Sequence, residues 1–311
     1  MNGALLHEPV LQGEVIRLLR PNQDGIYLDC TVGGGGHAEA ILRSGGLSTR
    51  LIGIDRDSEA FKRSRNRLKP FGGRVELHND SFENLAGLLA GRKVDGILMD
   101  LGVSSFMLDD PPRGFSFAAD GPLDMRMDRR EPLTAAEIVN GYPEKELSRI
   151  FKKYGEERFA SRIARAVVRQ RSVKPITGTL ELAELIKSAV PRTEFSRIHP
   201  ATRVFMALRI AVNRELENLE GTVNSAVEHL VTGGRLVVIS FHSLEDRIVK
   251  RALGALAKGC VCPPSMPVCV CGKKPAVKLL FKKPITAGPE EAARNPRSRS
   301  AKLRAAERLA A

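Results

Sequence analysis

Short apolar runs alternate with charged, helix-forming stretches over the first hundred residues, and this alternation strongly limits the folds open to the chain. The apolar runs predict buried strands at residues 26–29, 51–55, 74–78 and 96–100. Helical patterns begin at Ala38 after the first strand and extend to Leu68 after the second. Strands that alternate with helices in this way form parallel sheets with crossover helices. We therefore expect an α/β fold built on an open, mainly parallel sheet.

Three of the four predicted strands end in an aspartate, namely Asp29, Asp55 and Asp100. Ligands of open α/β sheets bind outside the carboxyl ends of the strands. We therefore expect the three carboxyl groups to face one binding site.

Four consecutive glycines follow the first predicted strand: Gly33, Gly34, Gly35 and Gly36. Glycine allows tight turns and close approach of the backbone to a ligand, so the loop predicts a cofactor site. With Ala38, the loop also satisfies the Gly-x-Gly-x-x-Gly/Ala fingerprint of dinucleotide-binding proteins. The loop alone does not choose between cofactors.

The acids beside the loop favour one kind of cofactor. Asp29 stands just before the glycines, where it would repel a dinucleotide pyrophosphate but attract the ammonium group of S-adenosylmethionine. Asp55 is spaced to accept hydrogen bonds from ribose hydroxyls, and residues 79–82 can flank an adenine. These features favour S-adenosylmethionine, with a Rossmann-type dehydrogenase as the alternative.

The pattern changes after Asp100. Residues 105–131 have the composition of an irregular loop, residues 134–190 are helical, and residues 201–230 form one long helical run. A fifth strand follows at residues 234–240, and the last forty residues have the pattern of a basic, loop-rich tail. The simplest organisation is an α/β domain of residues 1–110 and 200–311, interrupted by an all-helical substrate-binding domain of residues 111–199.

The charge balance favours a polyanionic partner. The chain has 49 Lys and Arg against 36 Asp and Glu, a formal net charge of +13. No apolar stretch reaches the eighteen residues that a membrane span needs, and the N-terminus lacks the features of a signal peptide. Because the cysteines do not form a spread disulfide framework, we expect a cytoplasmic protein.

Two segments are candidates for contact with nucleic acid. Arg158, Arg162, Arg165 and Arg169 recur at helical spacing, with Phe159, Ile163 and Val167 placed to pack inward. This stripe predicts phosphate binding, or else an ordinary solvated face. Residues 273–311 add eleven Lys or Arg against three Glu, in either a second basic surface or a disordered, solubilising tail.

Long motifs in order along the chain resemble the bacterial RsmH/MraW family. They are HEPVL (7–11), DCTVGGGGHA (29–38), GIDRD (53–57), DGILMDLGVSS (95–105), RGFSF (113–117), GPLDMRMD (121–128), HPATRVFMALRIAVN (199–213), ISFHSLEDRIVK (239–250) and NPRSRSAKLRAAER (295–308). The resemblance implies a Rossmann-like methyltransferase sheet with a helical insertion, and methylation of N4 of a cytidine in the decoding region of 16S rRNA. It implies S-adenosylmethionine at Gly35, Gly36, His37, Asp55, Phe82 and Asp100, and 16S rRNA or the small ribosomal subunit as the partner. A methyltransferase acting on another nucleic acid or on protein, or a non-catalytic RNA-binding protein, are the alternatives.

The chemistry of an amino group suggests catalytic candidates. The amine of cytosine is a poor nucleophile and needs an acceptor for its proton. Asp100 is the first candidate, although it could contact the cofactor or merely cap its strand, and His242, after the fifth strand, is the second. Residues 243–246 fit a helix N-cap box. Phe115 and Phe117 could stack on a base or pack in the core.

Four cysteines lie close together near the C-terminus: Cys260, Cys262, Cys269 and Cys271. Their spacing allows a zinc-stabilised loop, a redox pair or four reduced thiols in a surface turn. The proposed chemistry needs no metal, so the sequence predicts no catalytic metal site.

Overall fold

The computed structural model describes residues 9–191, 199–260, 262–263, 266, 268 and 271–310. The chain forms two compact units, Met1–Gly102 with Leu216–Ala311, and Val103–Glu215. Helix α10 (Ala201–Asn213) therefore belongs to the second unit, whereas the sequence placed residues from 200 onward in the first.

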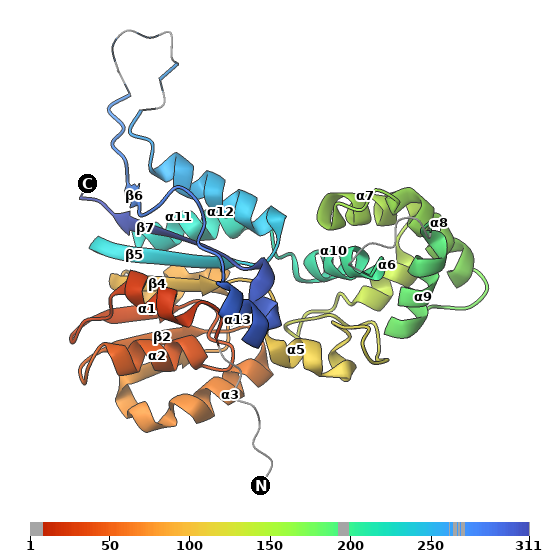
Figure 1. The fold of residues 1–311 in the computed structure, drawn as a ribbon, viewed down its shortest axis with the longest axis horizontal. Coiled ribbons are helices and arrows are strands. Elements are labelled where there is room, and N and C mark those ends of the chain that lie inside the picture. Colours follow the sequence, from red (N-terminus) through yellow and green to blue (C-terminus); the bar gives the residue numbers. More distant parts are fainter. Residues whose placement is uncertain are drawn as a thin grey trace. The chain divides into compact units, whose positions relative to one another are not determined.

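The first unit contains a seven-stranded sheet in the order β3-β2-β1-β4-β5-β7-β6 (Figure 1). The strands are β1 (Ile26–Asp29), β2 (Arg50–Ile54), β3 (Val75–His78), β4 (Val94–Asp100), β5 (Leu230–Ser240), β6 (Val277–Leu279) and β7 (Lys302–Arg308). Neighbours among β1 to β5 pair in parallel, while β7 pairs antiparallel with β5 and with β6. The strand order reverses between β1 and β4, which is the usual place for a ligand in such sheets.

Alternate strand residues face opposite sides of the sheet, because side chains in a strand have a period of two. Tyr27 and Leu98 pack with one buried cluster, and Leu28 and Ile97 pack with the other. The first cluster includes residues of α1 (Gln12–Leu19), α2 (Gly36–Ser44) and α3 (Ser58–Leu68). The second includes residues of α4 (Leu85–Leu89), α11 (Leu219–Glu228) and α12 (Ser243–Leu256). Helices thus cover both faces, and the predicted Rossmann-like α/β class is confirmed.

The C-terminal segment corrects the sequence analysis. Residues expected to form a loop-rich tail instead supply β6, the short helix α13 (Pro289–Arg294) and β7. Leu303, Ala305 and Ala306 are buried, and the charged side chains between them are paired: Arg304 with Asp246 at 2.7 Å and Glu307 with Arg235 at 2.8 Å. This part of the chain is neither disordered nor a mere solubilising tail.

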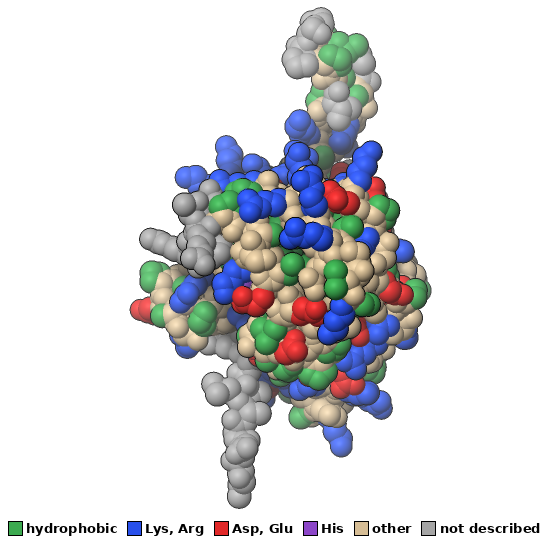
Figure 2. Space-filling model, turned by 90° about the vertical axis from the view of Figure 1, so that its right-hand side faces the viewer, with side chains coloured by type: hydrophobic (Ala, Val, Ile, Leu, Met, Phe, Trp, Pro, Cys, Tyr) green, Lys and Arg blue, Asp and Glu red, His purple; other side chains and the backbone are tan. Residues whose placement is uncertain are grey.

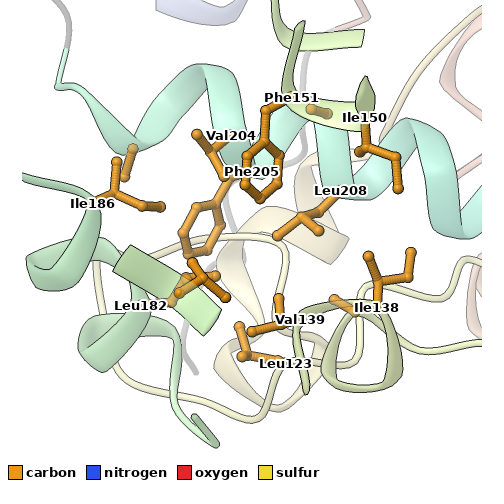
Figure 3. Close-up of a cluster of buried hydrophobic side chains, with 14 of the residues drawn as sticks. Leu123, Ile138, Val139, Ile150, Phe151, Leu182, Ile186, Val204, Phe205 and Leu208 are labelled. Carbon is orange, nitrogen blue, oxygen red and sulfur yellow. The ribbon is translucent and has the colours of Figure 1, made fainter. Parts of the chain in front are cut away.

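The second unit is helical. It contains α5 (Ser105–Asp109), α6 (Ala135–Gly141), α7 (Glu144–Gly155), α8 (Ala160–Arg171), α9 (Thr179–Ala189) and α10. Their apolar side chains meet in one core, part of which is drawn in Figure 3. There Phe205 and Leu208 of α10 lie among side chains such as Phe151 of α7, Val139 of α6 and Leu182 of α9. The single helical run expected over 201–230 is two helices, since α10 ends at Asn213 and is followed by Arg214, whose left-handed φ of 51° breaks the helix.

The sequence predicted an irregular loop over residues 105–131, but its first five residues form helix α5. The rest of that segment is irregular apart from one 3-10 turn at Pro111–Arg113, and it is held in place within the helical unit. The buried Arg113 guanidinium donates to the carbonyls of Arg126 and Met127, at 2.9 and 3.1 Å. The Asn213 amide of α10 accepts from the backbone N–H of Met127 and donates to the carbonyl of Met125, both at 2.7 Å. These bonds satisfy backbone groups that have no helix or strand partner.

Candidate active site

The three strand-end aspartates lie together because β2, β1 and β4 are adjacent in the sheet. Thr31, just after β1, connects two of them: its backbone N–H donates to Asp29 Oδ1 at 3.1 Å, and its hydroxyl accepts from the backbone N–H of Asp100 at 2.7 Å. The register brings Asp29 beside Gly53 of β2 and Leu98 of β4. The carboxyl groups therefore share one region at the carboxyl edge of the sheet.

The glycine loop connects β1 to α2 in a conformation that requires glycine. Gly33 and Gly35 have φ values of 53° and 81°, in the left-handed region that other residues rarely adopt. Gly35 is the N-cap of α2 and has no side chain with which to cap the first helical turn, and a helix N-terminus favours a nearby anionic group such as a carboxylate. A Cβ at Gly36 would collide with Pro9. Gly35 packs closely against α3, so both glycines also allow close packing of the loop.

Asp55 holds this loop from the neighbouring strand. Its Oδ2 accepts from the backbone N–H of Gly33 at 2.8 Å, and its Oδ1 accepts from the backbone N–H of Asp57 at 2.9 Å. Asn79, after β3, donates from its side chain to the Asp55 carbonyl at 2.8 Å. Phe82 is half-buried a few residues on, with the Arg56 guanidinium 5.9 Å from its ring centre. A carboxylate keeps further acceptor positions, so Asp55 can also receive hydroxyl groups.

Burial raises the pKa values of all three aspartates, and a neighbouring carboxylate adds to each shift. Burial is the main cause for each one. The pKa of Asp29 rises to about 7 and that of Asp55 to about 6, and the Asp55 charge adds to the shift at Asp29. The pKa of Asp100 lies well above its ordinary value, with the charges of Asp29 and Glu245 contributing. The site therefore holds crowded, buried carboxyl groups, and the positive charge of Arg56 offsets part of the shift at Asp55.

This electrostatic arrangement fits a cationic cofactor. Asp29 Oδ2 and Asp100 Oδ1 are buried and have no hydrogen-bond partner within the part of the chain that the structure describes. An acceptor left in this way is costly unless a ligand donates to it. An ammonium group and a sulfonium would supply positive charge there, whereas a pyrophosphate would add repulsion. The residues present therefore fit S-adenosylmethionine.

His37, in the first turn of α2, is buried, and its Nε2 lies 3.7 Å from Asp100 Oδ2. The imidazole therefore borders the carboxyl group that ends β4. His37 is also one of the residues that the resemblance suggested for the cofactor, and its side chain lies beside a strand-end acid.

His242 is placed differently from the expectation. The sequence predicted an N-cap box over residues 243–246, but the N-cap of α12 is His242 itself. Its Nδ1 accepts from the backbone N–H of Glu245 at 3.4 Å, and Glu245 Oε2 accepts in return from the backbone N–H of His242, also at 3.4 Å. A cap-forming imidazole has one nitrogen engaged with the backbone, which favours a positioning role over proton transfer.

Glu245 is the acid that sequence reasoning missed. It is buried and its charge acts on Asp100. Its Oε2 also accepts from the backbone N–H of Phe241 at 2.9 Å. The signal was present in the sequence as an acid three residues after His242, but a histidine is not among the residues favoured at N-caps, so the box was assigned one residue too late.

The remaining candidates lie outside this cluster of acids. Phe115 is buried in the core of the helical unit, and Phe117 packs at that core edge-on to Phe205, with ring centres 4.8 Å apart. These contacts favour the core-packing interpretation, more strongly for Phe115. Residues 7 and 8 of the HEPVL motif and Cys269 fall outside the described residues.

The arginine stripe is exposed, while Ile163 and Val167 are buried beneath it. Arg158 does not share the helix face as expected, because α8 begins at Ala160. Arg165 lies 3.7 Å from Glu144, whereas Arg162 and Arg169 make no ion pair with any residue that the structure describes.

The reversed strand order, the glycine loop and the acids that favour a cation together define an S-adenosylmethionine-dependent methyltransferase. More particularly, the chain belongs to the MraW methylase family, whose model matches residues 4–309.

Curated relatives match this chain over nearly its whole length. One from Carboxydothermus hydrogenoformans is 53% identical over 306 residues, which is 97% of this chain and 98% of the relative, and one from Geobacter sp. (strain M21) is also 53% identical, over 307 residues. Both are named ribosomal RNA small subunit methyltransferase H. A solved structure from Clostridium thermocellum, titled a putative rRNA methylase, covers 96% of this chain and 95% of its own at a TM-score of 0.43 and 13% identity.

Proposed function

We propose that this protein methylates N4 of a cytidine in the decoding region of 16S rRNA, in the cytoplasm, with S-adenosylmethionine as methyl donor. The observation that carries the proposal is the group of crowded carboxyls, whose raised pKa values call for a cationic ligand at the sheet edge. The names of the relatives support ribosomal RNA of the small subunit as the substrate. The cytidine and its N4 position rest on the motif resemblance.

We assign the cofactor contacts to the glycine loop and the acids around it. Asp29 would accept from the ammonium group, and the carboxylate would lie at the start of α2, beside Gly36 and His37. Asp55 would accept from the ribose, and Phe82 would lie along the adenine. Bound in this way, S-adenosylmethionine supplies an electrophilic methyl carbon.

We assign proton acceptance to Asp100. Its Oδ1 is buried without a partner among the described residues, so it can accept a hydrogen bond from the cytosine amine. That bond aims the nitrogen lone pair away from the carboxyl group, and the same oxygen then takes up the proton that the amine loses. Positive charge held beside Asp29 and Asp100 lowers their pKa values, which keeps the acceptor ionised when the site is filled.

We assign RNA binding to the helical unit, with Arg162 and Arg169 of α8 as phosphate contacts. Both are exposed cations without an ion pair within the described part of the chain. Figure 2 shows many Lys and Arg side chains on the face it presents, with Asp and Glu side chains among them. Arginine is suited to phosphate because its planar guanidinium can donate two hydrogen bonds to one phosphate group.

The direct test combines the purified protein, deuterated-methyl S-adenosylmethionine and small ribosomal subunits from cells that lack this gene. Mass spectrometry of the digested rRNA should find the label in N4-methylcytidine at one position. Label in another nucleoside, or only in DNA or protein supplied in parallel, would overturn the proposed substrate. Binding of a nicotinamide dinucleotide in place of S-adenosylmethionine would overturn the cofactor.

A further inference from the structure

The segment that connects α12 to β6 is a long loop that contains a cluster of cysteines. Residues 257–276 contain no helix or strand in their described part, and loops above about 12–15 residues without such elements are uncommon in compact proteins. This loop is also where three cysteines gather: Cys260, Cys262 and Cys271. A long loop with clustered thiols needs a physical reason for its shape.

The separations of the thiols match those of metal ligands. The Sγ atoms of Cys260 and Cys271 lie 3.8 Å apart, and the ligand atoms of all three cysteines lie within 4.8 Å of one another. A disulfide would bring two sulfurs to about 2.05 Å. Tetrahedral zinc with Zn–S bonds of about 2.3 Å places its sulfur ligands about 3.8 Å apart. The spacing of Cys260 and Cys271 is therefore that of an edge of a zinc–thiolate tetrahedron.

The surroundings of the cluster suit thiolates. The backbone N–H of Cys262 donates to Cys260 Sγ at 3.4 Å, which stabilises negative charge on that sulfur. Lys258, Lys273 and Lys274 are exposed in the same loop and offset the charge of several thiolates. Soft sulfur ligands select zinc over the harder cations magnesium and calcium.

We propose that Cys260, Cys262 and Cys271 bind one Zn²⁺ that closes the loop between α12 and β6. The site is structural, because no step of the methyl transfer uses these residues. Metal binding adds its free energy to the folded form of the loop, since the unfolded loop has no preformed site. The proposal stands independently of the substrate assigned above.

The first experiment measures metal in the full-length protein. After purification under reducing conditions and dialysis against buffer without metal, elemental mass spectrometry should find about one zinc per chain. Replacing the zinc with Co²⁺ should give the intense visible and near-ultraviolet absorption of tetrahedral cobalt thiolate. X-ray absorption at the zinc edge should show sulfur neighbours at about 2.3 Å.

Two variants provide the comparison. Cys260→Ser with Cys271→Ser should reduce zinc at least tenfold, whereas Met266→Ala, an exposed change in the same loop, should leave it unchanged. A parallel Cys269→Ser variant tests whether that thiol is the fourth ligand, because the number of sulfur neighbours in the wild type should then exceed that in the variant by one. Equal zinc in the wild type and the double variant, or a wild type whose loop cysteines are isolated as disulfides without zinc, would overturn the proposal.

Limited proteolysis tests the structural role. Lys258 and Lys273 border the proposed site, so trypsin reports on the loop from both sides. Chelation of zinc should accelerate cleavage at these lysines at least tenfold, while binding of S-adenosylmethionine should remain unchanged. The double serine variant should be cut at the accelerated rate with or without chelator. Cleavage that is indifferent to chelator in the wild type would contradict a loop closed by metal.

Discussion

At the scale of single residues, the main feature of the site is a group of buried carboxyl groups whose ionised forms are destabilised. Burial raises the pKa of Asp29, Asp55 and Asp100; the charge of Asp55 adds to the shift at Asp29, and the charge of Asp29 adds to the shift at Asp100. Groups with shifted pKa values are common at functional sites, where a bound ligand can stabilise their ionised form. Here the partner must carry positive charge.

Replacing Asp100 by Asn keeps the shape of the side chain and one acceptor oxygen but removes the charge. If Asp100 accepts the amine proton, the rate of methyl transfer should fall by roughly two to four decades. Single-turnover measurements with saturating S-adenosylmethionine and RNA isolate this step. Affinities for both ligands should change far less. A variant that loses cofactor affinity but keeps its single-turnover rate would assign Asp100 to binding and leave the proton acceptor unidentified.

Cofactor affinity should depend on pH through Asp29 and Asp55, whose pKa values are about 7 and about 6. A cation binds best to the ionised carboxylates, so binding releases protons below pH 7. Affinity should rise by up to about tenfold per pH unit for each proton released and level off above pH 7. Calorimetry in two buffers of different ionisation enthalpy measures the proton count. The Asp29→Asn variant should bind S-adenosylmethionine more weakly, and its affinity should depend less on pH. If the affinity of the wild type does not change between pH 5.5 and 7.5, cofactor binding is not linked to these protonations.

The stability of the ligand-free protein should change in the opposite direction. The folded-state pKa values of these two acids lie above the ordinary value of 3.8, so the folded state binds more protons than the unfolded state between about pH 4 and 7. The contribution of these groups to the free energy of unfolding is therefore full at acidic pH and is lost as the pH rises through 6 and 7. Denaturation in urea at several pH values checks this sign, with Asp29→Asn as the variant that should weaken the dependence.

The sequence predicted which residues lie together where their position at the end of a strand determines their place in the sheet. Each of Asp29, Asp55 and Asp100 ends a parallel strand, so they could be grouped before any coordinates were known. Glu245 could not be grouped with them, because it lies on a helix, and its approach to Asp100 depends on how α12 packs. The capping role of His242 was missed for a related reason: it depends on backbone dihedral angles that the residue type does not disclose.

At the scale of elements, the glycine loop acquires its shape from a neighbouring strand as well as from its own residues. Gly33 and Gly35 supply the unusual dihedral angles, and Asp55 fixes them by accepting from the Gly33 N–H. The loop and β2 are therefore one binding element.

Asp55→Ala should consequently weaken S-adenosylmethionine about ten- to a hundredfold, since it removes a bond to the ribose and a bond to the loop, worth roughly 1.5–3 kcal/mol in all. Calorimetry measures the change. Asp24→Ala, at an exposed aspartate that precedes β1 and so lies beyond the end of the strand opposite to the loop, serves as the control and should bind normally. Unchanged affinity in Asp55→Ala would remove this residue from the site.

The strand β7 shows the limit of sequence patterns for elements. Leu303 and Ala305 alternate with charged residues, but two apolar positions, one of them a small alanine, give only a weak signal of a strand. In the sequence, Arg304 and Glu307 resemble surface residues. Their pairing with Asp246 and Arg235 depends on elements far away in the sequence. Strands β1, β2 and β4 were predictable because they contain continuous apolar runs, as strands buried on both faces usually do, whereas β3 alternates apolar and polar residues.

If β7 is a core strand, Leu303→Ala should lower the free energy of unfolding by about 2–5 kcal/mol, because the side chain is fully buried. Leu47→Ala makes the same substitution at a position that is 84% exposed and should change stability by less than about 0.5 kcal/mol. Urea denaturation of the two variants provides the comparison. A Leu303→Ala protein as stable as Leu47→Ala would show that β7 contributes no packing.

At the scale of the whole molecule, an excess of positive charge accompanies a site that is itself acidic. The net charge of +13 cannot be assigned to the cofactor region, where aspartates predominate. Exposed cations elsewhere must account for it, and those of α8 are among the candidates. This separation of charge is what a protein needs if it is to hold a cationic cofactor and a polyanionic substrate together.

Arg162→Ala with Arg169→Ala should weaken RNA binding and flatten its dependence on salt, by about 1.4 in the logarithmic slope if two phosphate contacts are lost. Cofactor affinity should not change. The control is Arg43→Ala with Lys62→Ala, which removes the same charge from two exposed side chains of the other unit. Equal salt slopes for the two double variants would show that the arginines of α8 form a solvated face.

The position of β7 in the sheet also determines when the sheet can be completed during synthesis of the chain. This strand lies between β5 and β6, so the methyltransferase sheet stays incomplete until residues 302–308 have left the ribosome. The helical unit has its own core and can fold earlier. At about 5–20 residues per second, roughly 10–40 s separate the emergence of the first four strands from that of the seventh. During that interval the glycine loop belongs to a sheet that still lacks β7, although β1, β2 and β4, which carry the cofactor acids, have already emerged.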